Sequence, residues 1–103
     1  MSEEKTMNEK SFIDEYKSWF RIFHKSEDDD IGKQLDGSYK VLKPLIGDFD
    51  PTTFSQGTEL VYERVRYVRN ESVEYFSDNF QSLIMDASID FLALVSEGDE
   101  DGY

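Results

Sequence analysis

The stretch ESVEYFSDNFQSLIMDASIDFLALVS, from Glu71 to Ser96, has the clearest periodicity in the chain. Apolar side chains recur every three or four residues, which is the spacing of one face of an α-helix. They are Val73, Phe76, Phe80, Leu83, Ala87, Phe91 and Leu94. A continuous helix over this stretch would be about 39 Å long at 1.5 Å per residue. We predict a long C-terminal amphipathic helix, with a break near Asn79 or Ser88 as the alternative.

The same part of the chain is strongly acidic. Asn70 to Tyr103 contains nine carboxylates and no Lys, Arg or His. On a continuous helix most of these carboxylates fall on the side away from the apolar face. We predict an acidic ridge on that side, formed by Glu71, Glu74, Asp78, Asp86, Asp90 and Glu97.

A second apolar set lies on the predicted helix, away from its first apolar face. It consists of Met85, Ile89 and Leu92, and we call it the apolar strip. We expect the helix to be central to a bundle, which would bury the strip. The alternative is that the strip is exposed beside the acidic ridge and forms a protein-binding surface.

Two segments upstream have helical spacing as well. In residues 11–25, SFIDEYKSWFRIFHK, the aromatic side chains recur at three and four residues and are expected in the core, with a binding stripe on this helix as the alternative. They are Phe12, Tyr16, Trp19, Phe20 and Phe23. A second helix is predicted from Ile31 to Ile46, with Pro44 kinking or ending it near Lys43.

The middle of the chain is less regular. A short helix is expected from Pro51 to Gln56, with Gly57 ending it. Residues 58–69 fit either a helix or a strand. Because the sequence offers no clear second strand to pair with, we predict a helix there.

These elements indicate an all-α fold, a compact bundle of four to five helices. A length of 103 residues suits one domain. We expect a single helical domain over residues 1–103, with a frayed N-terminal segment at about 1–7 and an acidic C-terminal tail at about 97–103.

Charge and composition limit the partners. The net charge of −12 disfavours direct binding to nucleic acids or to anionic membranes, which repel such a chain. The chain has no cysteine, which excludes disulfides and thiol chemistry, and no apolar run long enough to span a membrane. We expect a cytoplasmic protein.

Signals for catalysis or metal binding are weak. His24 is the only histidine, and the chain contains no glycine-rich phosphate loop, nucleophile elbow or zinc signature. The acidic run DDDIG, which begins at Asp28, fails the EF-hand spacing. Its glycine comes one residue early, and its twelfth position is Tyr39 instead of Glu. We expect no cofactor, no metal and no enzymatic activity.

Two stretches together carry a family resemblance. DEYKSWFRIF (residues 14–23), followed by RVRYVRNESVEYFSDNF (residues 64–80), resembles some immunity proteins of bacterial contact-dependent growth inhibition (CDI) systems. Members of that family neutralise toxin domains, often nucleases, that neighbouring cells deliver. The family is diverse, so the resemblance assigns no binding residue.

The charge pattern leads to the same hypothesis, an immunity protein that binds a basic toxin domain. Opposite charge speeds the encounter, and apolar anchors slow dissociation. The expected partner-binding residues are Glu71, Glu74, Tyr75, Asp78, Asp86 and Asp90, with Asp28, Asp29 and Asp30 as the alternative site. The alternative functions are a phage-type nucleic-acid mimic that inhibits a DNA-binding or defence protein, and an acidic interaction or scaffold domain.

Overall fold

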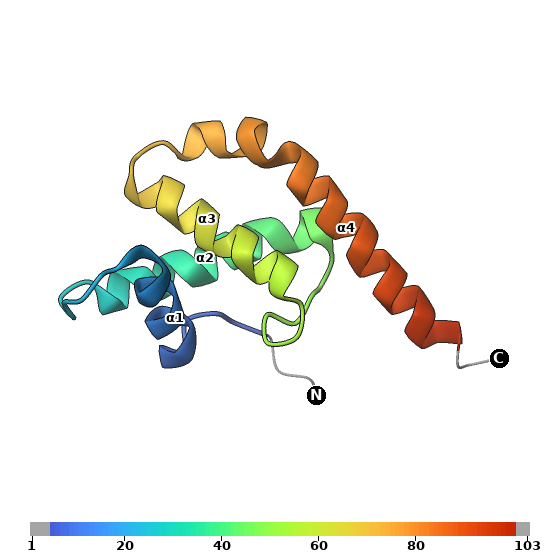
Figure 1. Ribbon diagram of the computed structural model, residues 1–103, viewed down its shortest axis with the longest axis horizontal. Coiled ribbons are helices and arrows are strands. Elements are labelled where there is room, and N and C mark those ends of the chain that lie inside the picture. Colours follow the sequence, from blue (N-terminus) through green and yellow to red (C-terminus); the bar gives the residue numbers. More distant parts are fainter. Residues whose placement is uncertain (1–4, 101–103) are drawn as a thin grey trace.

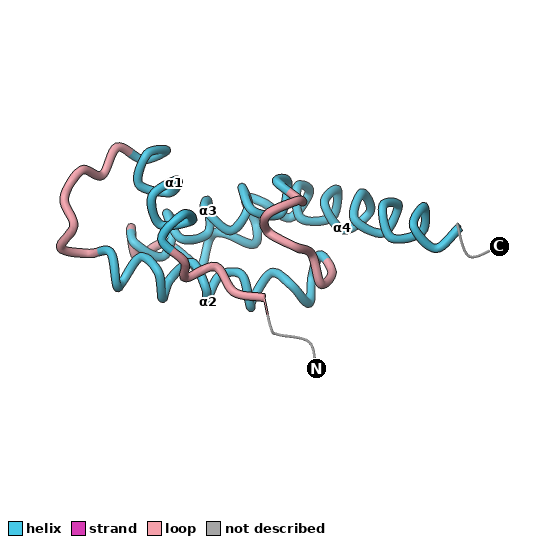
Figure 2. Tube along the Cα trace, turned by 90° about the horizontal axis from the view of Figure 1, so that it is seen from below, coloured by secondary structure: helices cyan, strands magenta, loops and turns pink. Residues whose placement is uncertain are grey.

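The structure, a computed structural model, describes residues 5–100, and all regular secondary structure within them is helical. Its elements are α1 (Lys10–Phe20), α2 (Asp28–Ile46), α3 (Ser55–Arg69), the short 3-10 helix η1 (Val73–Tyr75) and α4 (Phe76–Glu100). No strand occurs within these residues, so the predicted all-α fold is confirmed (Figure 2). Residues 1–4 of the expected frayed segment and 101–103 of the expected tail lie outside the described residues.

The core lies between α1, α2 and α3, with α2 and α3 packed along each other (Figure 1). Three tyrosines, Tyr16, Tyr39 and Tyr62, are among its largest fully buried side chains. Even Met7, within the segment expected to fray, is fully buried, and its backbone N–H donates to Asp36. Among the described side chains of α4, only Phe76 and Ala87 are buried. The core therefore depends mainly on the first three helices.

Helix α1 ends five residues before the predicted end at Lys25. Arg21 adopts the left-handed conformation with φ of 57°, and the N–H groups of Arg21 and Ile22 both donate to the carbonyl of Lys17. This arrangement closes the last turn and directs the chain away from the helix axis. As a result Phe23, expected in the core, is 88% exposed.

Helix α2 continues through Pro44 to Ile46. Of the two expectations, a kink or an end near Lys43, the end was wrong. Proline removes one N–H donor, but its fixed φ is close to the helical value and the helix goes on to Ile46. Gly47 forms the actual end, with its N–H bonded to the Lys43 carbonyl at 2.7 Å. Its φ of 133° lies in a region that favours glycine.

The predicted short helix over residues 51–56 is also absent. In its place Asp50 organises a turn, in which its carboxylate accepts hydrogen bonds from the N–H and the hydroxyl of Thr52. Gly57 lies inside α3 and does not end a helix. It allows close packing, because a Cβ built there would lie 2.7 Å from the ring of the buried Phe49.

Helix α4 begins at Phe76, so residues 71–96 do not form one continuous helix. Glu71 has a φ of 57° and residues 73–75 form η1, which changes the direction of the chain before α4 starts. From there α4 passes α3 and the end of α2 and extends away from the other helices (Figures 1 and 2). The radius of gyration is 14.5 Å, compared with about 13 Å for a compact domain of this length.

Candidate functional site

The apolar strip on α4 is exposed to solvent. Met85, Ile89 and Leu92 are 58%, 58% and 65% exposed. Their spacing of four and three residues aligns them along one side of the helix, opposite the side on which Phe76 and Ala87 are buried. The expected central position of α4 was therefore wrong, and the alternative of an exposed strip is the one observed.

Two leucines expected on the buried face of α4 are exposed as well. Leu83 and Leu94 share a helix face with Phe76 and Ala87, yet each is about half exposed. Leu83 borders the hollow between α3 and α4 and is left partly open there. Leu94 lies beyond Phe91, which packs on Phe54, in the part of α4 that extends past the other helices (Figure 1). The part of α4 from Leu83 to Leu94, which we call its outer part, thus presents apolar side chains on more than one side.

Asp86 and Asp90 lie between these two exposed apolar lines. At about 100° per residue, both carboxylates fall between the strip on one side and Leu83 and Leu94 on the other. They are one helical turn apart and both exposed. An exposed apolar surface with carboxylates inside it is suited to a partner that has both apolar and basic groups.

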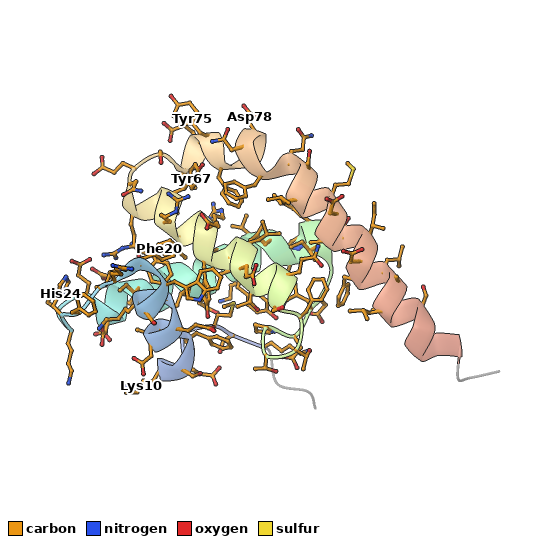
Figure 3. All side chains as sticks on the ribbon, in the orientation of Figure 1. Lys10, Phe20, His24, Tyr67, Tyr75 and Asp78 are labelled. Atoms are coloured by element: carbon orange, nitrogen blue, oxygen red, sulfur yellow. The ribbon has the colours of Figure 1, made fainter. Side chains whose placement is uncertain are left out.

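Three of the other acids of the predicted ridge are placed differently, and the side chain of the fourth, Glu97, lies outside the described part of the structure. Glu71 lies in the turn after α3 and Glu74 in η1, so neither extends a line of carboxylates along α4. Asp78, in the first turn of α4, lies on the same side as the strip. Tyr75, expected as an anchor, is exposed in η1, and Figure 3 shows it pointing outward near Asp78. The structure therefore separates Glu71, Glu74 and Tyr75 from Asp86 and Asp90.

The alternative acidic site is at the start of α2. Asp28, Asp29 and Asp30 form its first turn, where carboxylates interact favourably with the helix dipole. Asp28 also forms an ion pair with Lys17, at 2.6 Å. This site and the outer part of α4 lie at opposite ends of the molecule (Figure 1).

Internal cations neutralise part of the charge around the alternative site. Glu27, next to Asp28, is paired with Arg69. Hydrogen bonding and attraction from this guanidinium hold the pKa of the Glu27 carboxyl below its ordinary value. The outer part of α4 differs, because Asp86 and Asp90 belong to a stretch that contains no cation.

Trp19 is exposed, although the core was its expected place and a binding stripe only the alternative. Its side chain is 45% exposed and lines two hollows of about 240 and 230 Å³. Both hollows also include Glu59. Helical spacing places Trp19 near the core, and only the packing of α1 on α3 determines that its ring remains accessible.

Potential metal ligands are not clustered in the described part of the chain. No three His, Cys, Asp or Glu side chains among its residues are placed to hold a metal ion. His24 is exposed at the end of the molecule remote from α4, with its Nδ1 3.0 Å from the Ser26 hydroxyl (Figure 3). None of the helices within residues 5–100 has the length and apolar character needed to cross a membrane.

Comparison with known proteins adds no identification. The chain matches no protein-family model, and neither the curated proteins nor the solved structures include a significant match.

Proposed function

We propose that this protein is an immunity-type inhibitor that binds a basic toxin domain and blocks its activity. The observation that supports this best is the outer part of α4, where the exposed strip lies beside Asp86 and Asp90 in a stretch without cations. Exposed apolar surface of this kind marks interaction sites. The surrounding charge selects a partner of opposite sign.

Charge and apolar surface act on different steps of binding. The net charge of −12 attracts a basic partner over a distance and raises the association rate, which is critical for an inhibitor that must act before damage occurs. The strip then excludes water and slows dissociation. Inhibition follows from occupation of the toxin surface and requires no catalysis by this protein.

A nuclease is the toxin class that fits this chemistry. A nuclease holds phosphates in a positively charged cleft, and an acidic protein can cover such a cleft. The same charge keeps the inhibitor away from nucleic acids and anionic membranes. The inhibitor would act in the cytoplasm, where a nuclease toxin meets its substrate.

Protection of cells is the direct test. Cells that express the toxin encoded by the neighbouring gene should grow when this protein is co-expressed, and the two proteins should form a stable complex in vitro. Absence of both protection and binding would refute the proposed function. Competition with DNA for several unrelated DNA-binding proteins would support a nucleic-acid mimic instead.

Association kinetics can locate the binding surface. The double substitution Asp86→Lys/Asp90→Lys should slow association with the toxin by about tenfold or more and weaken its dependence on salt. The matched control is Asp29→Lys/Asp30→Lys, which changes the net charge equally at the start of α2. If the control slows association more than the α4 variant does, the toxin binds at the start of α2 and not on α4.

The strip is tested by the dissociation rate. Ile89→Ala removes apolar contact without changing charge, so it should leave association nearly unchanged and raise the dissociation rate. A central anchor contributes at least about 1.4 kcal/mol, which corresponds to a tenfold change. An unchanged dissociation rate would show that the strip lies outside the interface.

A further inference from the structure

Trp19 stands between two hollows on the surface formed by α1, α3 and α4. Its ring forms a T-shaped pair with that of Tyr62, with a centroid distance of 5.2 Å, and 45% of the Trp19 side chain is exposed. The hollow of about 240 Å³ is lined by Glu59, Glu63 and Phe80, and the hollow of about 230 Å³ by Glu15 and again Glu59, together with other residues. We call the two together the Trp19 groove.

The groove has negative charge and no positive charge of its own. Three carboxylates line it, whereas neither hollow is lined by Lys or Arg. Glu63 accepts hydrogen bonds from Arg66, and Glu15 accepts one from the Tyr62 hydroxyl. Within residues 5–100, Glu59 makes no ion pair or side-chain hydrogen bond, and it lies one helical turn from Glu63. Glu59 is therefore available to pair with an external cation.

Size and chemistry indicate what the groove accepts. Each hollow is smaller than the roughly 300–1,000 Å³ of typical small-molecule sites, and it is large enough for one long side chain. A cation is attracted to the face of an indole ring, and a guanidinium also donates paired hydrogen bonds to a carboxylate. Arginine combines the two contacts, since its planar group both stacks on aromatic rings and pairs with carboxylates.

The protein already contains one such arrangement. The guanidinium of Arg66 lies 5.9 Å from the ring centre of Phe20 and 5.3 Å from that of Tyr67, and it donates to Glu63. An arginine from another molecule, placed on Trp19 beside Glu59, would make the same combination of contacts.

We infer that the Trp19 groove binds an arginine side chain of the basic partner. This inference rests on the proposed function for the identity of the partner, although the binding of the side chain itself does not. The groove adds a specificity site to the surface of α4, because Phe80 and Leu83 of α4 line the same hollow as Trp19. A partner docked along α4 can therefore reach the groove with one side chain.

Trp19 is the only tryptophan in the chain, so its fluorescence reports binding directly. The probe is N-acetyl-arginine amide, titrated at about 0.15 M ionic strength so that distant charges are screened. The comparison compound is N-acetyl-citrulline amide, which has nearly the same shape without the charge. We expect a saturable change with the arginine probe and binding at least about tenfold weaker for citrulline. Equal responses to both compounds, or no saturable change, would overturn the inference.

Glu59→Gln tests the carboxylate. It should weaken binding of the arginine probe by about tenfold, since a charge-assisted hydrogen bond is lost. Glu9→Gln removes the same charge at an exposed residue just before α1 and should leave binding within about twofold, because exposed charges at a distance are largely screened. An equal loss in both variants would mean that the probe responds only to net charge, and would refute a specific site.

The two proposals fail separately. If the arginine probe binds but the protein neither binds nor neutralises the toxin, the groove inference is supported and the proposed function is refuted. If the protein neutralises the toxin but Glu59→Gln leaves its affinity for both the probe and the toxin unchanged, the proposed function is supported and the groove inference is refuted.

Discussion

Gly47 ends α2 where α4 passes it, and replacing it by alanine should loosen this contact. Its backbone, with φ of 133° and ψ of 168°, is in a region open essentially to glycine alone. A Cβ built on Gly47 would also lie 2.4 Å from Cδ2 of Phe91. The Phe91 ring would then have to leave its edge-to-face contact with Phe54, whose centroid is 5.5 Å away.

The expected loss of stability follows from these contacts. Holding a residue other than glycine in this backbone region costs about 1–3 kcal/mol. Loss of the aromatic pair adds about 0.5–1.5 kcal/mol. The lower entropy of alanine in the unfolded chain offsets about 0.4–1 kcal/mol. We therefore expect Gly47→Ala to lower the free energy of unfolding by about 2 kcal/mol.

Urea unfolding followed by circular dichroism measures this effect, and Gly37→Ala is the matched control. Gly37 lies in α2, and a Cβ added there would meet no heavy atom of the neighbouring elements within 4 Å, so alanine should stabilise the protein by about 0.5–1 kcal/mol. Because the ring contributes to the cost at Gly47, Gly47→Ala and Phe91→Ala should be less destabilising together than the sum of their separate effects. A Gly47→Ala protein as stable as the wild type, or strict additivity, would refute the reasoning.

Three further predictions concern single side chains. Burial and a carboxylate hydrogen bond raise the pKa of Tyr62 in the folded protein. The unfolded chain therefore loses this proton first, and the free energy of unfolding should fall as the pH rises above about 10. Tyr62→Phe should reduce this dependence on pH, measured by urea unfolding across alkaline pH. Tyr39→Phe leaves the buried carbonyl of Phe49 without its 2.6 Å hydrogen bond and should lower the free energy of unfolding by about 1–3 kcal/mol, and an unchanged urea midpoint would argue against this bond. Ile89→Ser should change the free energy of unfolding by less than about 0.5 kcal/mol, whereas Ala87→Asp places an unpaired charge in the core and should cost several kcal/mol. If thermal melts show a similar loss of stability for both variants, the strip is covered.

The fold class was predictable because helical periodicity is a local property. The segments around Tyr16, Tyr39 and Ala87 each repeat apolar residues at three or four positions, and each is helical in the structure. Residues 58–69 were ambiguous by composition, and the lack of a pairing strand was sufficient to assign them correctly. Helix ends were less predictable. The end of α1 depends on Arg21 adopting the left-handed conformation, which is unfavourable for residues other than glycine unless surrounding contacts offset its cost.

The candidate site was predictable in part. The concentration of carboxylates without cations in the last third of the chain is visible in the sequence, and so is the strip at Met85, Ile89 and Leu92. The separation of Glu71 and Glu74 from the later acids was not visible in the sequence. It arises because the turn at Glu71 and the 3-10 helix after it redirect the chain before α4. The accessibility of Trp19 had no sequence signal beyond its position at the end of an aromatic helix.

By itself the sequence determined that this protein is helical and acidic, and which residues can share a helix face, because spacing and charge belong to the chain. Only the tertiary structure decided which of those faces is covered. Ala87 is buried while Leu83 and Leu94, on the same side of α4, are half exposed. Burial depends on what lies opposite. Ala87 faces the core, Leu83 borders the hollow beside Trp19, and Leu94 lies beyond the contact of Phe91 with Phe54, where α4 extends past the other helices (Figure 1). That geometry leaves the surface on which the proposed function depends open to a partner.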